Sequence, residues 1–443
     1  MFFRELIYLK NKKKKSFSIA NEQNYILEPK DRSSLFFRKP DVIFRLKNNK
    51  EDYVNYSSFR MSINGKVISG IITSNGIEYT PRKDLKRGVY RVSVKYLMGN
   101  KEQSIDWQFN IIEHENYKCY LGVPHSHTAY SGGKGIPSDA YEMAKKEGVS
   151  FLIITEHYRA LKNRASGKVG TKFSHLKKIK ELDVFNSIQY EKKLFLKKNK
   201  RFLPMCGCEL STKFYGHVNI LNLPKYKNIN LKDIDKFYDY VKDENIVGSL
   251  NHPNKSIREV KPYKDLDKYV CLIEICNGSL SGKYNRYEET VYSLLDKGWI
   301  LGVLNSQDNH KENWGKDDNL TGVLMSKLKE DHLINALKNR RTYSTESPSL
   351  CLKFSINNYP MGSILNIKKD DTINMEIFLE DKKNKIKEVQ IITNNRECIF
   401  RDPVNKKSYK SNIKYKLKKE KGWILLKVIL EHNRLAFSSP VFY

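Results

Sequence analysis

The chain has 443 residues and a formal net charge of +30, from 80 Lys and Arg against 50 Asp and Glu. Its length exceeds what one hydrophobic core usually serves, so we expect about two to four domains. A hydrophobic content of 40% excludes wholesale disorder. Basic residues crowd every segment, which indicates a compositional bias and does not favour a nucleic-acid partner, although the basic field would attract a small anionic substrate.

Residues 1–24 are predicted to be an N-terminal extension that begins MFFRELIYLKNKKKK, with an apolar patch too short for a signal-peptide core. No run in the chain reaches the roughly 20 apolar residues of a membrane-spanning helix. The 7 cysteines form no regular disulfide framework, which predicts a reducing compartment. We therefore expect a cytoplasmic protein with no membrane partner.

Residues 25–117 contain short stretches that alternate between apolar and polar residues, such as YRVSVKY, separated by turn signals such as SNG and GN. This pattern predicts an antiparallel β-sandwich. It is similar to bacterial immunoglobulin-like modules, and nothing in it indicates catalysis.

Residues 118–345 alternate apolar strands with amphipathic segments such as PSDAYEMAKKEG, which predicts an α/β domain with parallel strands. In this part Cys206 and Cys208 form a C-x-C pair that we interpret as small buried residues, not thiolate ligands. Residues 346–443 return to alternating strands and predict a C-terminal β domain, again resembling a sandwich.

Polar side chains able to bind a metal lie at or near the ends of the middle-domain strands. In parallel α/β folds the carboxyl ends of strands share one rim, and H-x-H on a strand sends both imidazoles to one face. A mixture of imidazoles and carboxylates without thiolate favours Zn, Mn or Fe over Ca or Mg. The candidate ligands are His125, His127, His157, Glu209, His217, His252, Asp308 and His310.

Several ordered motifs extend this pattern. Together they resemble the polymerase and histidinol phosphatase (PHP) superfamily, in particular its CehA/McbA-like metallohydrolase branch, over residues 118–362. The motifs are HSHTAYSGG at 125–133, GVSFLIITEH at 148–157, GCELSTKFYGHVNIL at 207–221, NHPN at 251–254, IEICNGS at 273–279 and GVLNSQDNH at 302–310.

The resemblance implies a distorted (βα)7-type barrel, flanked by the two sandwich-like domains, with two or three divalent metal ions at the strand ends. It assigns His125 and His127 to the first ligand pair, Glu209 to the bridging carboxylate, and Asp308 with His310 to the last pair. His157, His217 and His252 match the remaining ligand positions. The chain departs from the family at Ser131, Gly132 and Gly133, where a ligand of a third metal is missing, and at Glu156, where Asp is usual.

The resemblance implies a metal-dependent phosphoesterase that uses a metal-bridging hydroxide, with Glu209 and Asp308 as the catalytic carboxylates. A carbon-ester, amide or carbamate hydrolase needs the same parts and remains an alternative; a nuclease and a non-catalytic binding protein are further alternatives. Candidate substrate contacts are Asn277, Arg159, Lys134 and Arg341. The sequence does not decide the physiological substrate or the oligomeric state.

Overall fold

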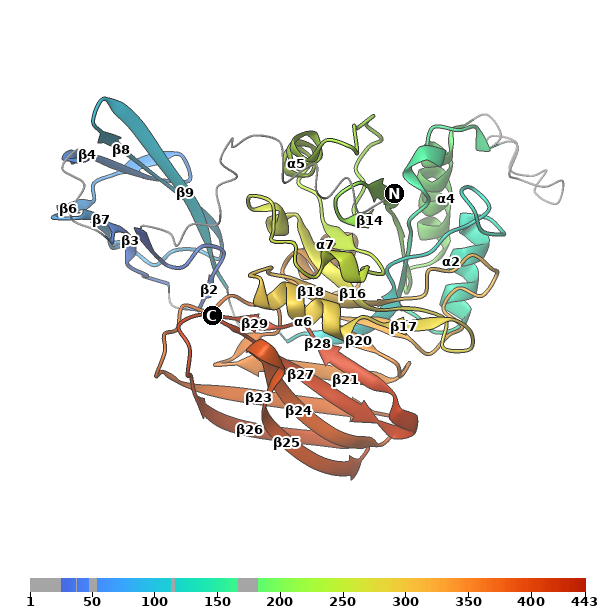
Figure 1. The fold of residues 1–443 in the computed structure, drawn as a ribbon. Helices are drawn as coiled ribbons and strands as arrows, with labels where there is room; N and C mark the ends of the chain where they lie inside the picture. Colours follow the sequence, from blue (N-terminus) through green and yellow to red (C-terminus); the bar gives the residue numbers. More distant parts are fainter. Residues whose placement is uncertain (1–24, 37, 48–53, 113–115, 166–181) are drawn as a thin grey trace. The chain divides into compact units, whose positions relative to one another are not determined.

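The computed structural model describes residues 25–443 apart from 37, 48–53, 113–115 and 166–181 (Figure 1). The chain divides into two compact units, Met1–His114 and Glu115–Tyr443. The predicted N-terminal extension, residues 1–24, lies outside the described part. Among the described helices none is long and apolar enough to cross a membrane.

The first unit consists of two β-sheets with the strand orders β1-β3-β7-β6 and β2-β9-β8-β4-β5. Both sheets contribute to one core, for example through Phe44 from the first and Trp107 from the second, as in the predicted sandwich. All ladders are antiparallel except the short pairing of β2 with β9. The strands are β1 Tyr25–Glu28, β2 Ser34–Leu35, β3 Val42–Leu46, β4 Val54–Ile63, β5 Lys66–Ile68, β6 Ile71–Thr73, β7 Gly76–Tyr79, β8 Gly88–Met98 and β9 Lys101–Ile111.

The second unit is built on a 10-stranded sheet with the order β12-β11-β10-β19-β20-β28-β27-β24-β25, in which β29 also pairs with β27. Strands β10, β11 and β12 are parallel neighbours, as the α/β pattern predicted. The residues of β11 are buried and alternate between two hydrophobic clusters, because both faces of a parallel sheet are covered. These strands are β10 Lys118–Val123, β11 Phe151–Ile154, β12 Leu203–Cys206, β19 Leu320–Met325 and β20 Thr342–Thr345.

A second sheet of this unit has the order β13-β14-β15-β16-β17, with β18 beside β16. The chain passes from the first sheet to the second at Gly207, between β12 and β13. A Cβ atom there would lie 2.2 Å from the carbonyl oxygen of Ile220, so the close approach requires glycine. The strands are β13 Cys208–Thr212, β14 Gly216–Ile220, β15 Gly248–Leu250, β16 Val270–Gly278, β17 Tyr284–Arg286 and β18 Gly302–Ser306.

The described strands do not form the closed (βα)7 barrel that the resemblance implied. Their continuous ladders make two sheets, and β14 runs antiparallel to both β13 and β15. Isolated parallel bridges join the two sheets at His157 with Glu209 and at Ser126 with Asn309. The sheets therefore meet where the candidate ligands lie.

Five α-helices are described in the second unit. Helix α2 packs on β11, α4 on β12, α6 on β16 and α7 on β19. Asp183 caps α4 and Asp233 caps α5; the Asp183 side chain accepts one backbone N–H of the first turn and the Asp233 side chain accepts two. The helices are α2 Pro137–Lys146, α4 Val184–Lys198, α5 Ile234–Asp243, α6 Glu288–Asp296 and α7 Glu330–Lys338.

The C-terminal β region continues the fold of the middle region within one compact unit. Strand β28 pairs with β20, so the 10-stranded sheet runs from the predicted middle domain into the predicted C-terminal domain. A third sheet, β22-β21-β23-β26, shares a core with it. These strands are β21 Leu350–Ile356, β22 Tyr359–Pro360, β23 Thr372–Asp381, β24 Ile386–Thr393, β25 Glu397–Lys406, β26 Ser408–Lys416, β27 Trp423–Leu430, β28 Leu435–Ser438 and β29 Val441–Phe442.

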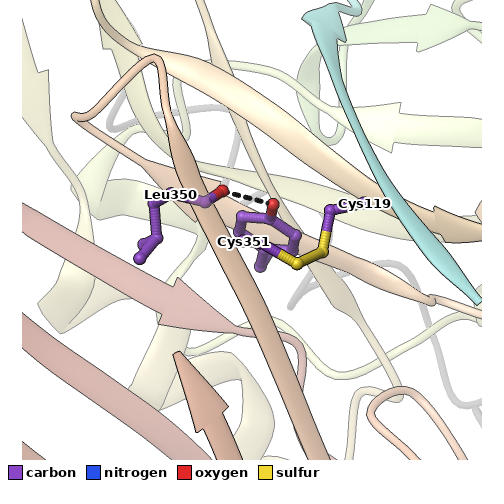
Figure 2. The surroundings of a disulfide bond; sticks show 4 residues. Cys119, Leu350 and Cys351 are labelled. Atoms are coloured by element: carbon purple, nitrogen blue, oxygen red, sulfur yellow. Dashed lines mark hydrogen bonds between the residues drawn. A yellow bond between two sulfur atoms is a disulfide. The ribbon is translucent and has the colours of Figure 1, made fainter. Parts of the chain in front are cut away.

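A disulfide joins Cys119 of β10 to Cys351 of β21 (Figure 2). Disulfides persist in oxidising environments, so this pair is at odds with the reducing compartment expected from the cysteine count. The two cysteines are 232 residues apart, and no spacing pattern in the sequence marks them as partners. Cys206 and Cys208 are free and buried, as predicted, and burial raises the pKa of both thiols.

Candidate metal centre

The structure brings all the predicted ligands together at the junction of the two sheets. Backbone hydrogen bonds hold the H-x-H and D-x-H motifs side by side: Asp308 N–H donates to the His125 carbonyl at 3.1 Å, and His127 N–H donates to the Asn309 carbonyl at 2.9 Å. Likewise, Glu209 N–H donates to the Glu156 carbonyl at 3.0 Å, which places His157 beside Glu209. Strand ends from both sheets thus supply the side chains.

Glu209 lies at the centre of the cluster, with its two carboxylate oxygens facing different imidazoles. Its Oε1 atom lies close to His125, His217 and His252, and its Oε2 atom lies close to His127 and His157. The distances from these oxygens to the nearest ring nitrogens are 3.5 Å for His125, 3.1 Å for His217, 3.3 Å for His252, 3.5 Å for His127 and 3.1 Å for His157. The Glu209 carboxylate therefore contacts two sets of histidines, one set through each oxygen.

Three overlapping groups have ligand atoms within 4.8 Å of one another. Two of them contain Glu209. Asp308 adds a carboxylate oxygen 3.2 Å from Nε2 of His125 and 3.3 Å from Nε2 of His127. The groups are His127 with His157 and His310; His125 with His127 and Glu209; and Glu209 with His217 and His252.

The arrangement fits divalent metal ions. Within the part of the chain that the structure describes, the buried Oδ1 atom of Asp308 and the buried Nδ1 atom of His217 make no well-formed hydrogen bond. Buried polar atoms are normally satisfied, and here several converge without satisfying one another. Imidazoles with carboxylates are a donor set that suits Zn, Mn or Fe.

Two of the ligands have an unusual backbone. Asp308 has φ of 50° and His252 has φ of 26°, a region that non-glycine residues rarely occupy. Such conformations persist where the surrounding structure enforces them, and they concentrate at functional sites. In these conformations the Asp308 carboxylate lies beside His125 and His127, and the His252 ring lies beside Glu209.

Burial and charge determine the protonation of the metal-free cluster. Burial alone would lower the pKa of His125, but the carboxylates of Asp308, Glu274 and Glu209 raise it to about 10. Burial alone would raise the pKa of Glu209 and of Asp308, but the neighbouring imidazoles, His125 first, hold the pKa of both well below the usual range. The cluster thus pairs ionised carboxylates with a protonated imidazole.

We therefore expect metal binding to release protons. A metal needs the imidazole lone pair, so below about pH 10 an ion must displace the proton of His125, and metal affinity should rise with pH through the neutral range. Calorimetric titration of metal-free protein with Zn²⁺, in buffers of different ionisation enthalpy, measures the protons released. Binding heats that do not depend on the buffer would contradict this protonation state.

Two residues at which the sequence departs from the PHP motifs, Ser131 and Glu156, have a structural role. Glu156 is fully buried and accepts hydrogen bonds from the backbone N–H of Thr128, at 2.9 Å, and from the hydroxyls of Thr128 and Ser131. The Ser131 hydroxyl also accepts a hydrogen bond from the His157 N–H at 3.0 Å. Ser131 and Glu156 therefore stabilise, through hydrogen bonds, the loop that follows the first ligand motif and its contact with the second.

Sequence reasoning missed two polar residues at this site. Asn251 donates from Nδ2 to Oε1 of Glu209 at 3.0 Å. Glu274 is completely buried in β16 and accepts from Nδ1 of His125 at 2.7 Å. The sequence did contain a signal for Glu274, which is a charged residue within the mostly apolar run VCLIEICNG. Because a charge is rarely buried without a partner, a glutamate in a buried strand indicates a polar partner nearby.

The residues predicted to contact the substrate do not converge on one place as the predicted metal ligands do. Asn277 is buried and donates from Nδ2 to Oε2 of Glu274 at 2.8 Å, so its amide nitrogen faces the interior. The guanidinium of Arg341 lies over the ring of Tyr117 and donates a hydrogen bond to the side chain of Asn335. These contacts engage it away from the candidate ligands. Lys134 and Arg159 are exposed. Their contact with substrate stays a prediction.

No family model and no curated protein matches the chain. Among solved structures, a two-domain protein from Bacteroides vulgatus ATCC 8482, described as containing a predicted PHP-like metal-dependent phosphoesterase, is 17% identical. The match covers 72% of this chain and 93% of that one, with a TM-score of 0.43. A putative alpha-galactosidase from Bacteroides fragilis NCTC 9343 is 10% identical over 92% of this chain and 96% of its own, with a TM-score of 0.24. Neither likeness is close enough to place the chain in a family.

Proposed function

We propose that the chain is a metal-dependent hydrolase of the PHP type, and specifically a phosphoesterase. The observation that carries the proposal is the position of Glu209, whose two oxygens lie within 3.5 Å of ring nitrogens from five histidines. The motifs in which these ligands occur resemble those of PHP enzymes. The number and identity of the metals belong to the proposal: two ions, with a third possible, of Zn, Mn or Fe.

The residues have distinct tasks in this proposal. Divalent ions bound here would lower the pKa of a water molecule and polarise the oxygen of a substrate ester. Glu209 would be shared between the ions, because it belongs to two of the three ligand groups. The side chain of Asp308 is 25% exposed, so its carboxylate is accessible to accept a proton from an attacking water.

The cluster has one side that is partly exposed to solvent, where an external substrate could reach the candidate ligands. His125 and His127 form a buried floor, whereas the side chains of His157, His217 and His310 are partly exposed. The net charge of +30 would attract an anionic phosphoester. A carbon-centred hydrolase could use the same ligands, so substrates must separate the two functions.

The test compares wild-type protein, purified without chelator, with a His125→Ala, Asp308→Ala double variant. Bound metal is measured by mass spectrometry, and turnover is measured on p-nitrophenyl phosphate, bis-p-nitrophenyl phosphate and p-nitrophenyl acetate. We expect stoichiometric transition metal and phosphoester turnover in the wild type, with both lost in the variant. An Asp239→Ala, His432→Ala variant is the matched control, because both of these side chains are exposed and neither is a candidate ligand.

The other outcomes discriminate between functions. Stoichiometric metal with turnover of the acetate alone would move the assignment to a carbon-ester hydrolase. No bound metal, and none taken up from Mn²⁺ or Zn²⁺, would overturn the metal centre itself.

A further inference from the structure

Glu274 occupies a position behind the metal centre from which its two oxygens reach different ligands. Its Oε1 atom accepts the Nδ1 proton of His125 at 2.7 Å. Its Oε2 atom accepts the backbone N–H of His252 at 2.6 Å and an Nδ2 proton of Asn277 at 2.8 Å. The Glu274 side chain is only 1% exposed, so these protein groups take the place of water around the carboxylate.

The contact with His125 determines which ring nitrogen can bind a metal. Because Glu274 accepts a proton from Nδ1, the lone pair of a neutral His125 lies on Nε2. This Nε2 atom faces the rest of the cluster, 3.1 Å from Nε2 of His127 and 3.2 Å from Oδ1 of Asp308. Glu274 therefore sets both the orientation and the tautomer of the first ligand.

The contact with His252 acts on the backbone. His252 has φ of 26°, and its N–H points at Oε2 of Glu274. A hydrogen bond to a buried carboxylate is among the stronger ones in proteins, and here it helps to hold a backbone conformation that is unfavourable for a non-glycine residue. The His252 ring is thereby kept 3.3 Å from Glu209.

We propose that Glu274 is a positioning residue that couples two of the metal-ligand groups. One carboxylate orients His125, which belongs to a group with His127 and Glu209, and also His252, which belongs to a group with Glu209 and His217. Removing it should weaken both groups, although it touches neither metal nor substrate. This inference rests on the proposed metal-dependent function.

Glutamine is an informative replacement because it has nearly the same shape but only one acceptor oxygen. If its oxygen faces His125, its NH₂ group meets the donors of His252 and Asn277. If its NH₂ group faces His125, Nδ1 must become the acceptor, and the proton moves to Nε2, where it blocks coordination. Either orientation of the glutamine disturbs one ligand group, whereas Glu274→Ala removes the hydrogen bonds to both His125 and His252.

The test is a metal-affinity measurement. Metal-free wild type, Glu274→Gln and Glu274→Ala are titrated with Zn²⁺ against a chromophoric chelator, and their Co²⁺ absorption spectra are recorded. Partners that orient ligands are worth about 10–100-fold in metal affinity, so we expect a loss of that size at one ion in Glu274→Gln and at both in Glu274→Ala. The Co²⁺ spectrum should change shape, which a merely structural defect would not cause in protein that still binds the ion.

Glu191→Gln is the matched control. Glu191 is also a fully buried carboxylate, and it accepts hydrogen bonds from the Tyr130 hydroxyl at 2.7 Å and the Ser138 N–H at 2.8 Å, but it belongs to no ligand group. We expect wild-type affinity in this variant. If Glu274→Ala does not fold, Asn277→Ala removes one anchor of Glu274 and should still weaken binding a few-fold.

Wild-type affinity and an unchanged Co²⁺ spectrum in the Glu274 variants would overturn the coupling while leaving the proposed function intact. Absence of metal binding by the wild type would overturn the proposed function, and this inference with it.

Discussion

Glu209→Gln should abolish the proposed activity and empty at least one metal position. Glutamine replaces one of two acceptor oxygens with an NH₂ group that faces imidazole nitrogens instead of an ion. Metal ions contribute several kcal/mol to stabilising the transition state, and each 1.36 kcal/mol is a factor of ten in rate. We expect a fall in phosphoester turnover of at least about 10³-fold, measured with p-nitrophenyl phosphate together with bound metal by mass spectrometry.

Glu191→Gln again serves as the control, because it removes a buried carboxylate of the same unit that lies outside the ligand groups. It should keep the bound metal and the wild-type turnover. Full activity in Glu209→Gln would exclude Glu209 as the shared ligand, and equal losses in the two variants would point to damage of the fold.

Replacing both Cys119 and Cys351 by serine should give the largest loss of stability. The disulfide closes a loop with a sequence separation of 232 residues, and removal of the crosslink gives the unfolded chain more conformational freedom. Chain-entropy arguments put the loss at up to about 5 kcal/mol in the free energy of unfolding. Urea unfolding followed by tryptophan fluorescence measures it, with Trp107 of the first unit replaced by Phe so that the signal comes from Trp299, Trp314 and Trp423.

Reduction of the wild type should produce the same shift of the urea midpoint. Cys398→Ser is the control, because Cys398 is exposed and unpaired, and it should leave the midpoint unchanged. A double variant as stable as the wild type, with the same response to reductant, would show that the crosslink does not form in solution.

The candidate ligands could be predicted because they lie next to recognisable strands. The apolar runs before His125 and His157 and before Asp308 mark strand ends, and parallel strands bring their carboxyl ends to one edge. Period-two alternation then places His125 and His127 on one face. The sequence therefore contains enough information to predict which side chains meet, even though the sheets that position them differ from the expected barrel.

The remaining features depend on long-range contacts that no local pattern encodes. At Gly207, where the chain changes sheet, the backbone comes so close to the Ile220 carbonyl that only glycine fits, and no local pattern marks this contact. The role of Glu274 depends on residues 149 and 22 positions away in the chain, and the disulfide partners lie 232 apart. A single sequence without related sequences gives no information on such pairs.

The sheet that continues from β20 into β28 affects how this chain can evolve and be shortened. Ser439, just after β28, accepts a hydrogen bond from the N–H of Val303 in β18 and contacts the hydroxyl of Thr342 in β20. A chain cut after residue 345 would keep the pairing of β20 with β19 but leave its other edge without β28, and exposed edges recruit other strands and lead to aggregation. We therefore expect the middle region to need the C-terminal region in order to fold, and insertions at this junction to be tolerated less well than insertions in the surface loops.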